Sequence, residues 1–147
     1  MIPRIDERTG KLPPGIYEAT WEEIVARYGT TAHRRGLLAG LKRALDNLQA
    51  AGCRRVYIDG SFITNKRIPG DIDCCYEGVG VQRALLDPAL QTYEPGNATQ
   101  KAAFGCEFFV AETRADLRGT RMLEFFQRDK LTGRPKGIIA LDLAELP

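Results

Sequence analysis

Residues 54–77 read RRVYIDGSFITNKRIPGDIDCCYE, and this stretch decides the fold that we expect. The run 54–59 carries apolar residues between charged ones and predicts a short strand that ends at Gly60. Asp71 leads into a second run, 72–76, which predicts a second strand. About a dozen residues join the two runs, so the two strands can lie side by side.

Two carboxylates lie at the start of the second run. Alternate residues of a strand point to the same face, so Asp71 and Asp73 project together while Ile72 turns into the core. Two like charges this close repel each other unless a cation lies between them. Mg²⁺ suits a pair of carboxylates together with substrate phosphates. Two such ions about 4 Å apart could activate a hydroxyl and stabilise a leaving pyrophosphate.

The turn after the first run supplies the other half of the pattern. Gly60 permits a tight turn and a close approach by a phosphate group. The Ser61 hydroxyl and nearby backbone N–H groups can hold phosphate oxygens, the more so if a helical turn begins there. Lys66 and Arg67 lie in the same loop and could neutralise a triphosphate. The spacer around Pro69 is poorly helical, so we expect at most one helical turn.

Gly60, Ser61, Asp71, Ile72 and Asp73 together resemble the signature of the polymerase-beta-type nucleotidyltransferase superfamily. The resemblance implies an α/β (α+β) domain with a small mixed central sheet flanked by helices. It also implies Mg²⁺-dependent transfer of a nucleoside monophosphate from an NTP to a hydroxyl. The chain looks like the minimal, stand-alone bacterial members, which often belong to toxin–antitoxin pairs and act on tRNA or a partner protein.

Three stretches, 12–15, 60–73 and 123–129, also look like a family of small uncharacterised bacterial proteins. The main resemblance covers 54–77 well, and elsewhere only the order of elements fits. The acceptor, whether RNA or a partner protein, stays open, as does the oligomeric state.

A third acidic residue on a later strand is implied by the same resemblance. The run 106–111 predicts such a strand, and Glu107 is our candidate for the third ligand or general base, with Glu112 and Asp142 as alternatives. Three carboxylates within about 5 Å on an open cleft would favour an enzyme. A cleft filled by Tyr76 or Phe109 would favour an inactive binding module, such as an antitoxin that neutralises a partner protein.

The remaining sequence fits one domain spanning 1–147, in which 1–19 is an irregular arm rich in proline. Thr20 with Glu23 has the spacing of a capping box and predicts a helix to about residue 28. Leucines at three- and four-residue steps predict a second helix over 32–51. Further expectations are a helix over 98–104, a helix or strand over 122–128, and a strand over 137–143.

Composition narrows the class of protein. Hydrophobic residues make up 44% and charged residues 27%, which is typical of a globular domain. The four cysteines form no C-x-x-C pair and there is one histidine, so no zinc site is expected. No apolar run approaches the roughly 20 residues of a membrane span. Free thiols and the absence of an apolar leader favour the cytoplasm.

The net charge of +2 neither requires nor excludes nucleic acid. Two local basic clusters are either solvated surface or a contact for RNA, phosphates or a partner. The first cluster comprises Arg34, Arg35, Lys42, Arg43, Arg54 and Arg55. The second comprises Arg128, Lys130, Arg134 and Lys136.

Overall fold

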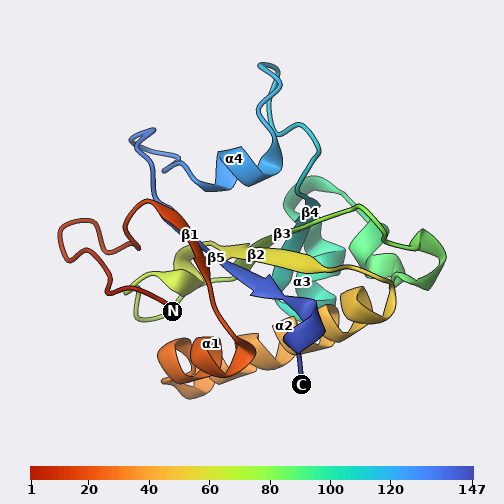
Figure 1. Cartoon of the computed structure of the whole chain (residues 1–147), viewed down its shortest axis with the longest axis horizontal. Helices are drawn as coiled ribbons and strands as arrows, with labels where there is room; N and C mark the ends of the chain where they lie inside the picture. Colours follow the sequence, from red (N-terminus) through yellow and green to blue (C-terminus); the bar gives the residue numbers. More distant parts are fainter.

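The computed structural model describes residues 1–147, and its centre is a five-stranded sheet (Figure 1). The strands lie in the order β1-β5-β2-β3-β4. In chain order they are β1 (Gly15–Glu18), β2 (Arg55–Asp59), β3 (Ile72–Tyr76), β4 (Cys106–Val110) and β5 (Gly137–Asp142). The α-helices are α1 (Trp21–Tyr28), α2 (Ala32–Ala50), α3 (Ala98–Phe104) and α4 (Met122–Phe126).

The sheet is mixed: its two inner strand pairs are antiparallel and its two outer pairs are parallel. β2 is antiparallel to both of its neighbours, β3 and β5, whereas β1 is parallel to β5 and β4 is parallel to β3. The predicted mixed α/β fold with a small mixed sheet and flanking helices is therefore confirmed. The pairing of β2 with β3 also confirms that the two runs of residues 54–77 lie side by side.

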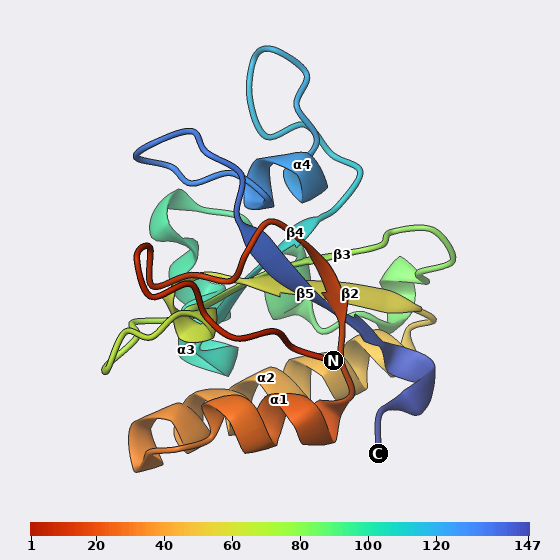
Figure 2. The same cartoon turned by 60° about the vertical axis from the view of Figure 1, so that its left-hand side comes forward.

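Helices α1, α2 and α3 cover one face of the sheet (Figures 1 and 2). Thr20 caps α1 by accepting a hydrogen bond from the backbone N–H of Glu23 at 3.2 Å, as the sequence predicted. The leucine stripe of α2 is completely buried at Leu41, Leu45 and Leu48. A continuous core of 29 buried residues fills the space between these helices and the sheet.

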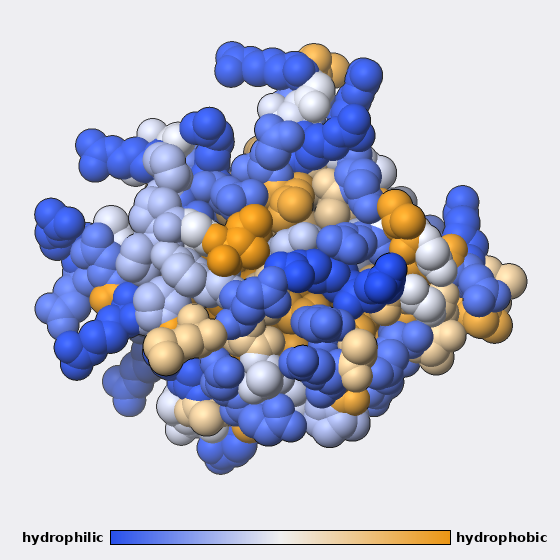
Figure 3. Space-filling model, in the orientation of Figure 1, coloured by the Kyte–Doolittle hydropathy of each residue, from blue (hydrophilic) through white to orange (hydrophobic).

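The opposite face of the sheet has a much thinner cover. The five-residue helix α4 lies over it, and two loops project beyond that helix (Figure 1). Only seven buried residues form the hydrophobic cluster here, among them Cys75, Met122 and Phe126. The surface view shows hydrophobic patches between hydrophilic projections, some of them beneath the uppermost loops (Figure 3). We call the face of the sheet that α1, α2 and α3 cover the closed face, and the face under α4 the open face.

The prediction that residues 1–19 form an irregular arm is wrong for the last part of that segment. Gly15–Glu18 forms β1, which pairs with Gly137–Ala140 of β5 through four residues in register. Two prolines precede these four residues and hide the strand pattern, and its partner lies more than 100 residues away in the chain.

The sequence did not decide between helix and strand for residues 122–128. In the structure, Met122–Phe126 is a helix. None of the helices has both the length and the apolar character of a membrane span.

Candidate active site

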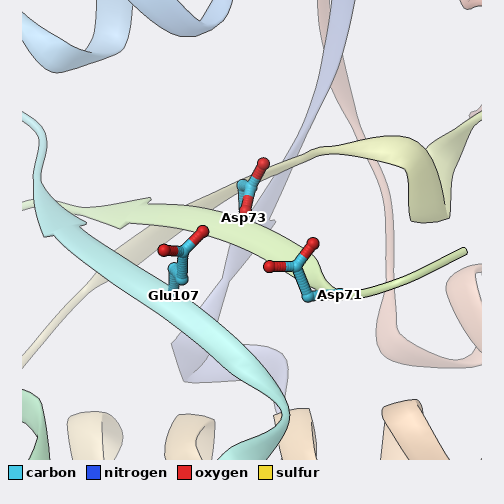
Figure 4. A group of neighbouring side chains, drawn as sticks. All are labelled: Asp71, Asp73 and Glu107. Atoms are coloured by element: carbon cyan, nitrogen blue, oxygen red, sulfur yellow. The ribbon is translucent and has the colours of Figure 1, made fainter. Parts of the chain in front are cut away.

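Three carboxylates meet at the edge of the open face. Asp71 lies just before β3, Asp73 within it and Glu107 within β4 (Figure 4). Each offers an oxygen atom, and all three atoms lie within 4.8 Å of one another. The structure therefore brings together the two acids of residues 54–77 and the first candidate for the third acid.

Strand register explains why these acids meet. In the sheet Asp73 lies opposite Asp59 of β2 on one side and opposite Glu107 of β4 on the other. Directly paired residues point to the same face, so a row of three acids crosses three adjacent strands. Ile72, between the two aspartates, is completely buried on the closed face, as expected from strand alternation.

The crowding of acids acts on Asp73. Burial, the contact with Glu107 and the charges of Asp71, Glu107 and Asp59 together raise the pKa of Asp73 from 3.8 to about 7. Its Oδ1 atom is buried and has no hydrogen-bond partner. An all-oxygen donor set with an unsatisfied buried oxygen suits a hard divalent cation such as Mg²⁺.

Two side chains from the α3 region contact the acids. The Lys101 Nζ atom lies 3.6 Å from Asp71 Oδ2 and 3.7 Å from Glu107 Oε1. The amide of Asn97, which has the left-handed φ of 47°, donates to Glu107 Oε1 at 3.3 Å. Lys101 thus supplies a positive charge from the protein itself where three carboxylates meet, and its side chain is 43% exposed.

Asp59, at the other end of the row of three acids, is neutralised differently. Lys136 Nζ, just before β5, donates to Asp59 Oδ1 at 2.5 Å, and both side chains are largely buried. Burial raises the pKa of Asp59, while the charge of Lys136 opposes that shift. Asp59 is therefore paired within the protein, whereas Asp73 is not.

A cavity of about 170 Å³ opens beside Asp73 and Glu107. Its lining has acids on the sheet side, three basic residues from the segment after α4, and apolar residues between them. The basic residues are Arg128, Lys130 and Lys136, and the apolar ones are Phe109, Met122, Phe125 and Phe126. Phe109 thus lines the cavity as one wall, alongside the acids.

The Gly60 turn is built directly against Asp73. Gly60 has a φ of 89°, and a Cβ atom there would lie 3.0 Å from the Asp73 backbone nitrogen and 3.1 Å from Asp73 Oδ2. Any other residue would meet both backbone strain and a clash with the acid. Ser61–Ile63 then forms a single 3-10 turn, which matches the short helical segment expected from the sequence.

Arg34 is a positioning residue that sequence reasoning missed. It was assigned to a basic surface cluster, yet its side chain is buried and donates to the carbonyls of Phe62 at 2.7 Å, Thr64 at 3.2 Å and Lys66 at 2.6 Å. Arg34 therefore ties the start of α2 to the loop that follows Ser61. The sequence of an amphipathic helix does not show which of its arginines is buried, because the carbonyls that bind the guanidinium lie elsewhere in the chain.

The other candidates do not belong to the cluster of three acids. Lys66 and Arg67 have exposed side chains that make no ion pair with them. Glu112 accepts hydrogen bonds from the backbone N–H of Gly78 at 3.1 Å. Asp142 lies at the opposite end of the sheet, where it accepts from the Ala144 N–H at 2.9 Å.

Comparison with known proteins gives one finding. Residues 3–142 match the model of a family described as a family of unknown function (DUF6932), so the chain belongs to that family. No curated protein and no solved structure matches the chain.

Proposed function

We propose that this member of DUF6932 is a nucleotidyltransferase that uses Mg²⁺ to transfer a nucleoside monophosphate from an NTP to a hydroxyl group of RNA or of a partner protein. The four buried free thiols fit a reducing cytoplasm as its location. The proposal extends the resemblance of residues 54–77 to the polymerase-beta-type superfamily.

One observation carries the proposal. Three carboxylates, one just before β3 and one in each of β3 and β4, converge within 4.8 Å, although the charges of Asp71 and Glu107 raise the pKa of Asp73. A cluster that destabilises the protein and leaves a buried oxygen of Asp73 unsatisfied is more typical of a binding site than of a structural contact.

Asp71, Asp73 and Glu107 would hold the metal. When bound, Mg²⁺ would neutralise charge on the phosphates and on the attacking and leaving oxygens. Across the cavity, Arg128 and Lys130 offer positive charge to the phosphate groups, while the charge of Lys136 is paired with Asp59. Arg128 and Lys130 lie in the second basic cluster of the sequence, so they complement the expected roles of Lys66 and Arg67.

The residues of the chain would then position two reactants. Gly60 and Ser61 would lie against the β- and γ-phosphates, and Glu107 would accept the proton of the acceptor hydroxyl. A bond forms between the acceptor oxygen and the α-phosphorus, and the bond to pyrophosphate breaks. Catalysis of this kind depends mainly on positioning and on neutralising charge.

Calorimetric titration of Mg²⁺-ATP and Mg²⁺-GTP tests the proposal. We expect wild-type protein to bind with a metal requirement, and the Asp71→Ala/Asp73→Ala double variant to lose binding. Asp142→Asn, an acid at the far end of the sheet, serves as the matched control and should bind like wild type. Absence of nucleotide binding by the wild type, together with no labelling of any macromolecule in its native lysate, would disprove the proposal.

Lys101 favours a second candidate, an inactive binding module that neutralises a partner protein. Its ammonium group already pairs with two of the three acids, Asp71 and Glu107, and so meets part of their charge without a metal. A degenerate site could use this internal cation to stabilise the fold without a metal. The two candidates predict opposite behaviour for a variant without that charge.

Lys101→Met separates the two candidates. If the acids form a metal site, the ammonium competes with Mg²⁺, so removing it should tighten Mg²⁺ binding. If Lys101 is a structural counter-ion, its removal should lower the melting temperature, and Mg²⁺ should not restore it. Lys42→Met, which removes another partly exposed lysine paired with one aspartate, controls for loss of a surface charge.

A further inference from the structure

A second hollow adjoins the acid cavity on the open face. It encloses about 500 Å³ and is lined mainly by apolar side chains: Tyr93, Phe109, Val110, Ala115, Met122 and Phe125, with Thr113 and Arg114 also in its wall. Three of these residues, Phe109, Met122 and Phe125, also line the acid cavity. The two hollows are therefore neighbours with shared walls, and we call the second one the aromatic pocket.

The aromatic rings of this pocket are arranged to receive a flat group. Phe109 is held edge-on against Phe126, with ring centroids 6.2 Å apart and an interplanar angle of 85°. The Tyr93 ring lies 6.3 Å from that of Phe109, between centroids, and is tilted by only 31°. Tyr93 is 50% exposed, so part of its side chain is accessible to a ligand.

The position of the pocket relative to the acids follows from the strand. Phe109 is two residues after Glu107 in β4, so both side chains point to the open face about 7 Å apart. This is a separation that a ribose can bridge. A nucleotide with its phosphates between the acids and the basic wall would thus bring its base to the pocket.

We infer that the aromatic pocket binds the nucleobase of the substrate nucleotide, stacked against the ring surface that Tyr93 and Phe109 form together. The inference rests on the proposed function and adds the location and character of the base site. Stacking on aromatic rings contributes to binding of every base, because each base has a π-face.

The polar lining indicates how selective the site is. Thr113 and Arg114 are the polar side chains of the pocket besides the Tyr93 hydroxyl, and both are exposed at its rim. The Thr113 hydroxyl already donates to the Val110 carbonyl at 2.7 Å. No buried donor or acceptor pair faces the edge of a base, so the site should prefer purines for their larger rings and distinguish poorly between adenine and guanine.

Two probes separate this inference from the proposed function. Adenosine without metal probes the aromatic pocket alone, and inorganic tripolyphosphate with Mg²⁺ probes the acid site alone. Mg²⁺-ATP probes both. The variants are Tyr93→Ala and Phe109→Leu, which keeps apolar volume but removes the ring. Leu85→Ala removes a side chain of the same 50% exposure outside the pocket and is the matched control.

We expect wild type to bind ATP at least tenfold more tightly than tripolyphosphate, to bind GTP within about threefold of ATP, and to bind adenosine weakly. Tyr93→Ala and Phe109→Leu should remove most of the advantage of ATP over tripolyphosphate, and they should remove the adenosine signal. Tyr93 does not line the acid cavity, so Tyr93→Ala should leave tripolyphosphate binding and the melting curve near wild type. Leu85→Ala should change none of these.

Each opposite result has a distinct meaning. Adenosine binding that depends on Tyr93, without any binding of tripolyphosphate or ATP, would support the pocket and overturn the proposed function. Equal binding of ATP and tripolyphosphate by wild type would overturn the pocket and leave the acid site standing. The pocket is also overturned if ATP and adenosine bind both variants as tightly as wild type.

Discussion

The two faces of the sheet differ in how they use their residues. The closed face has three helices and a core of 29 buried residues, whereas the open face has one short helix and a cluster of seven. Asp71, Asp73 and Glu107 lie on the open face, and Cys74 and Cys75, adjacent in β3, bury their thiols on opposite faces. The closed face therefore supplies the stability that tolerates three crowded acids on the other face.

The largest expected difference between the faces concerns side-chain truncation. Leu41→Ala on the closed face should lower the free energy of unfolding by about 3 kcal/mol, because Leu41 is completely buried in the large core. Met122→Ala on the open face should lower it by only about 2 kcal/mol, because the cover there can collapse onto the gap. Urea unfolding followed by circular dichroism measures both. Equal losses would show that the open face is as firmly packed as the closed one.

Arg34 joins the two faces, since it extends from α2 to the loop that leads to the site. Arg34→Met should cost about 2 kcal/mol, because it leaves buried carbonyls of that loop without a donor. Its neighbour Arg35 is exposed, and Arg35→Met should stay within about 0.5 kcal/mol of wild type. Amide hydrogen exchange should accelerate over residues 61–67 only in the first variant. An unchanged loop would mean that Arg34 serves the helix alone.

Unlike the substitutions above, which lower stability, Asp73→Asn should stabilise the metal-free protein by about 1 kcal/mol at pH 8. The pKa of Asp73 is raised from 3.8 to about 7 in the folded protein, so its ionisation favours the unfolded state. The wild type therefore loses this part of its stability as the pH rises from about 4 to 7, and the gain from the substitution should vanish near pH 4. Melting curves at several pH values measure it. Asp46→Asn, an exposed acid paired with Lys42, should show no such gain; a gain that does not depend on pH would contradict this account.

The smallest effect concerns the two adjacent cysteines. Burial raises the pKa of both thiols well above the usual range, so neither should react with iodoacetamide at pH 8 in the native protein. In mild urea Cys75 should react before Cys74, because the thin cover of the open face separates more easily. Mass spectrometry of the labelled peptides gives the order. If Cys74 reacts first, the cover of the closed face separates more easily than that of the open face, which would contradict this account.

Sequence predicted the closed face and its elements closely, because periodic leucines and a capping pair are local signals. The strand over 72–76 and the helix over 98–104 lie where they were expected. The common direction of Asp71 and Asp73 follows from alternation alone. The position of Glu107 opposite Asp73 depends on the register of two parallel strands, which no local pattern specifies.

Contacts between distant segments account for what sequence could not predict. β1 has only four residues, and it forms a strand through its pairing with β5. The burial of Arg34 depends on loop carbonyls 28 to 32 residues further along the chain. Lys136 lies 77 residues from Asp59, and Tyr93 comes from a loop of short 3-10 turns, so neither could be assigned to the site from its own neighbourhood.

The order of strands also has a consequence for synthesis on the ribosome. β5 lies between β1 and β2, so the first strand made has no partner in the sheet until residues 137–142 have been translated. Until then β1 remains unpaired, and one edge of β2 offers free backbone groups to other chains. The nascent chain can form the hairpin of β2 and β3 early, but the complete sheet must close after nearly the whole sequence is available.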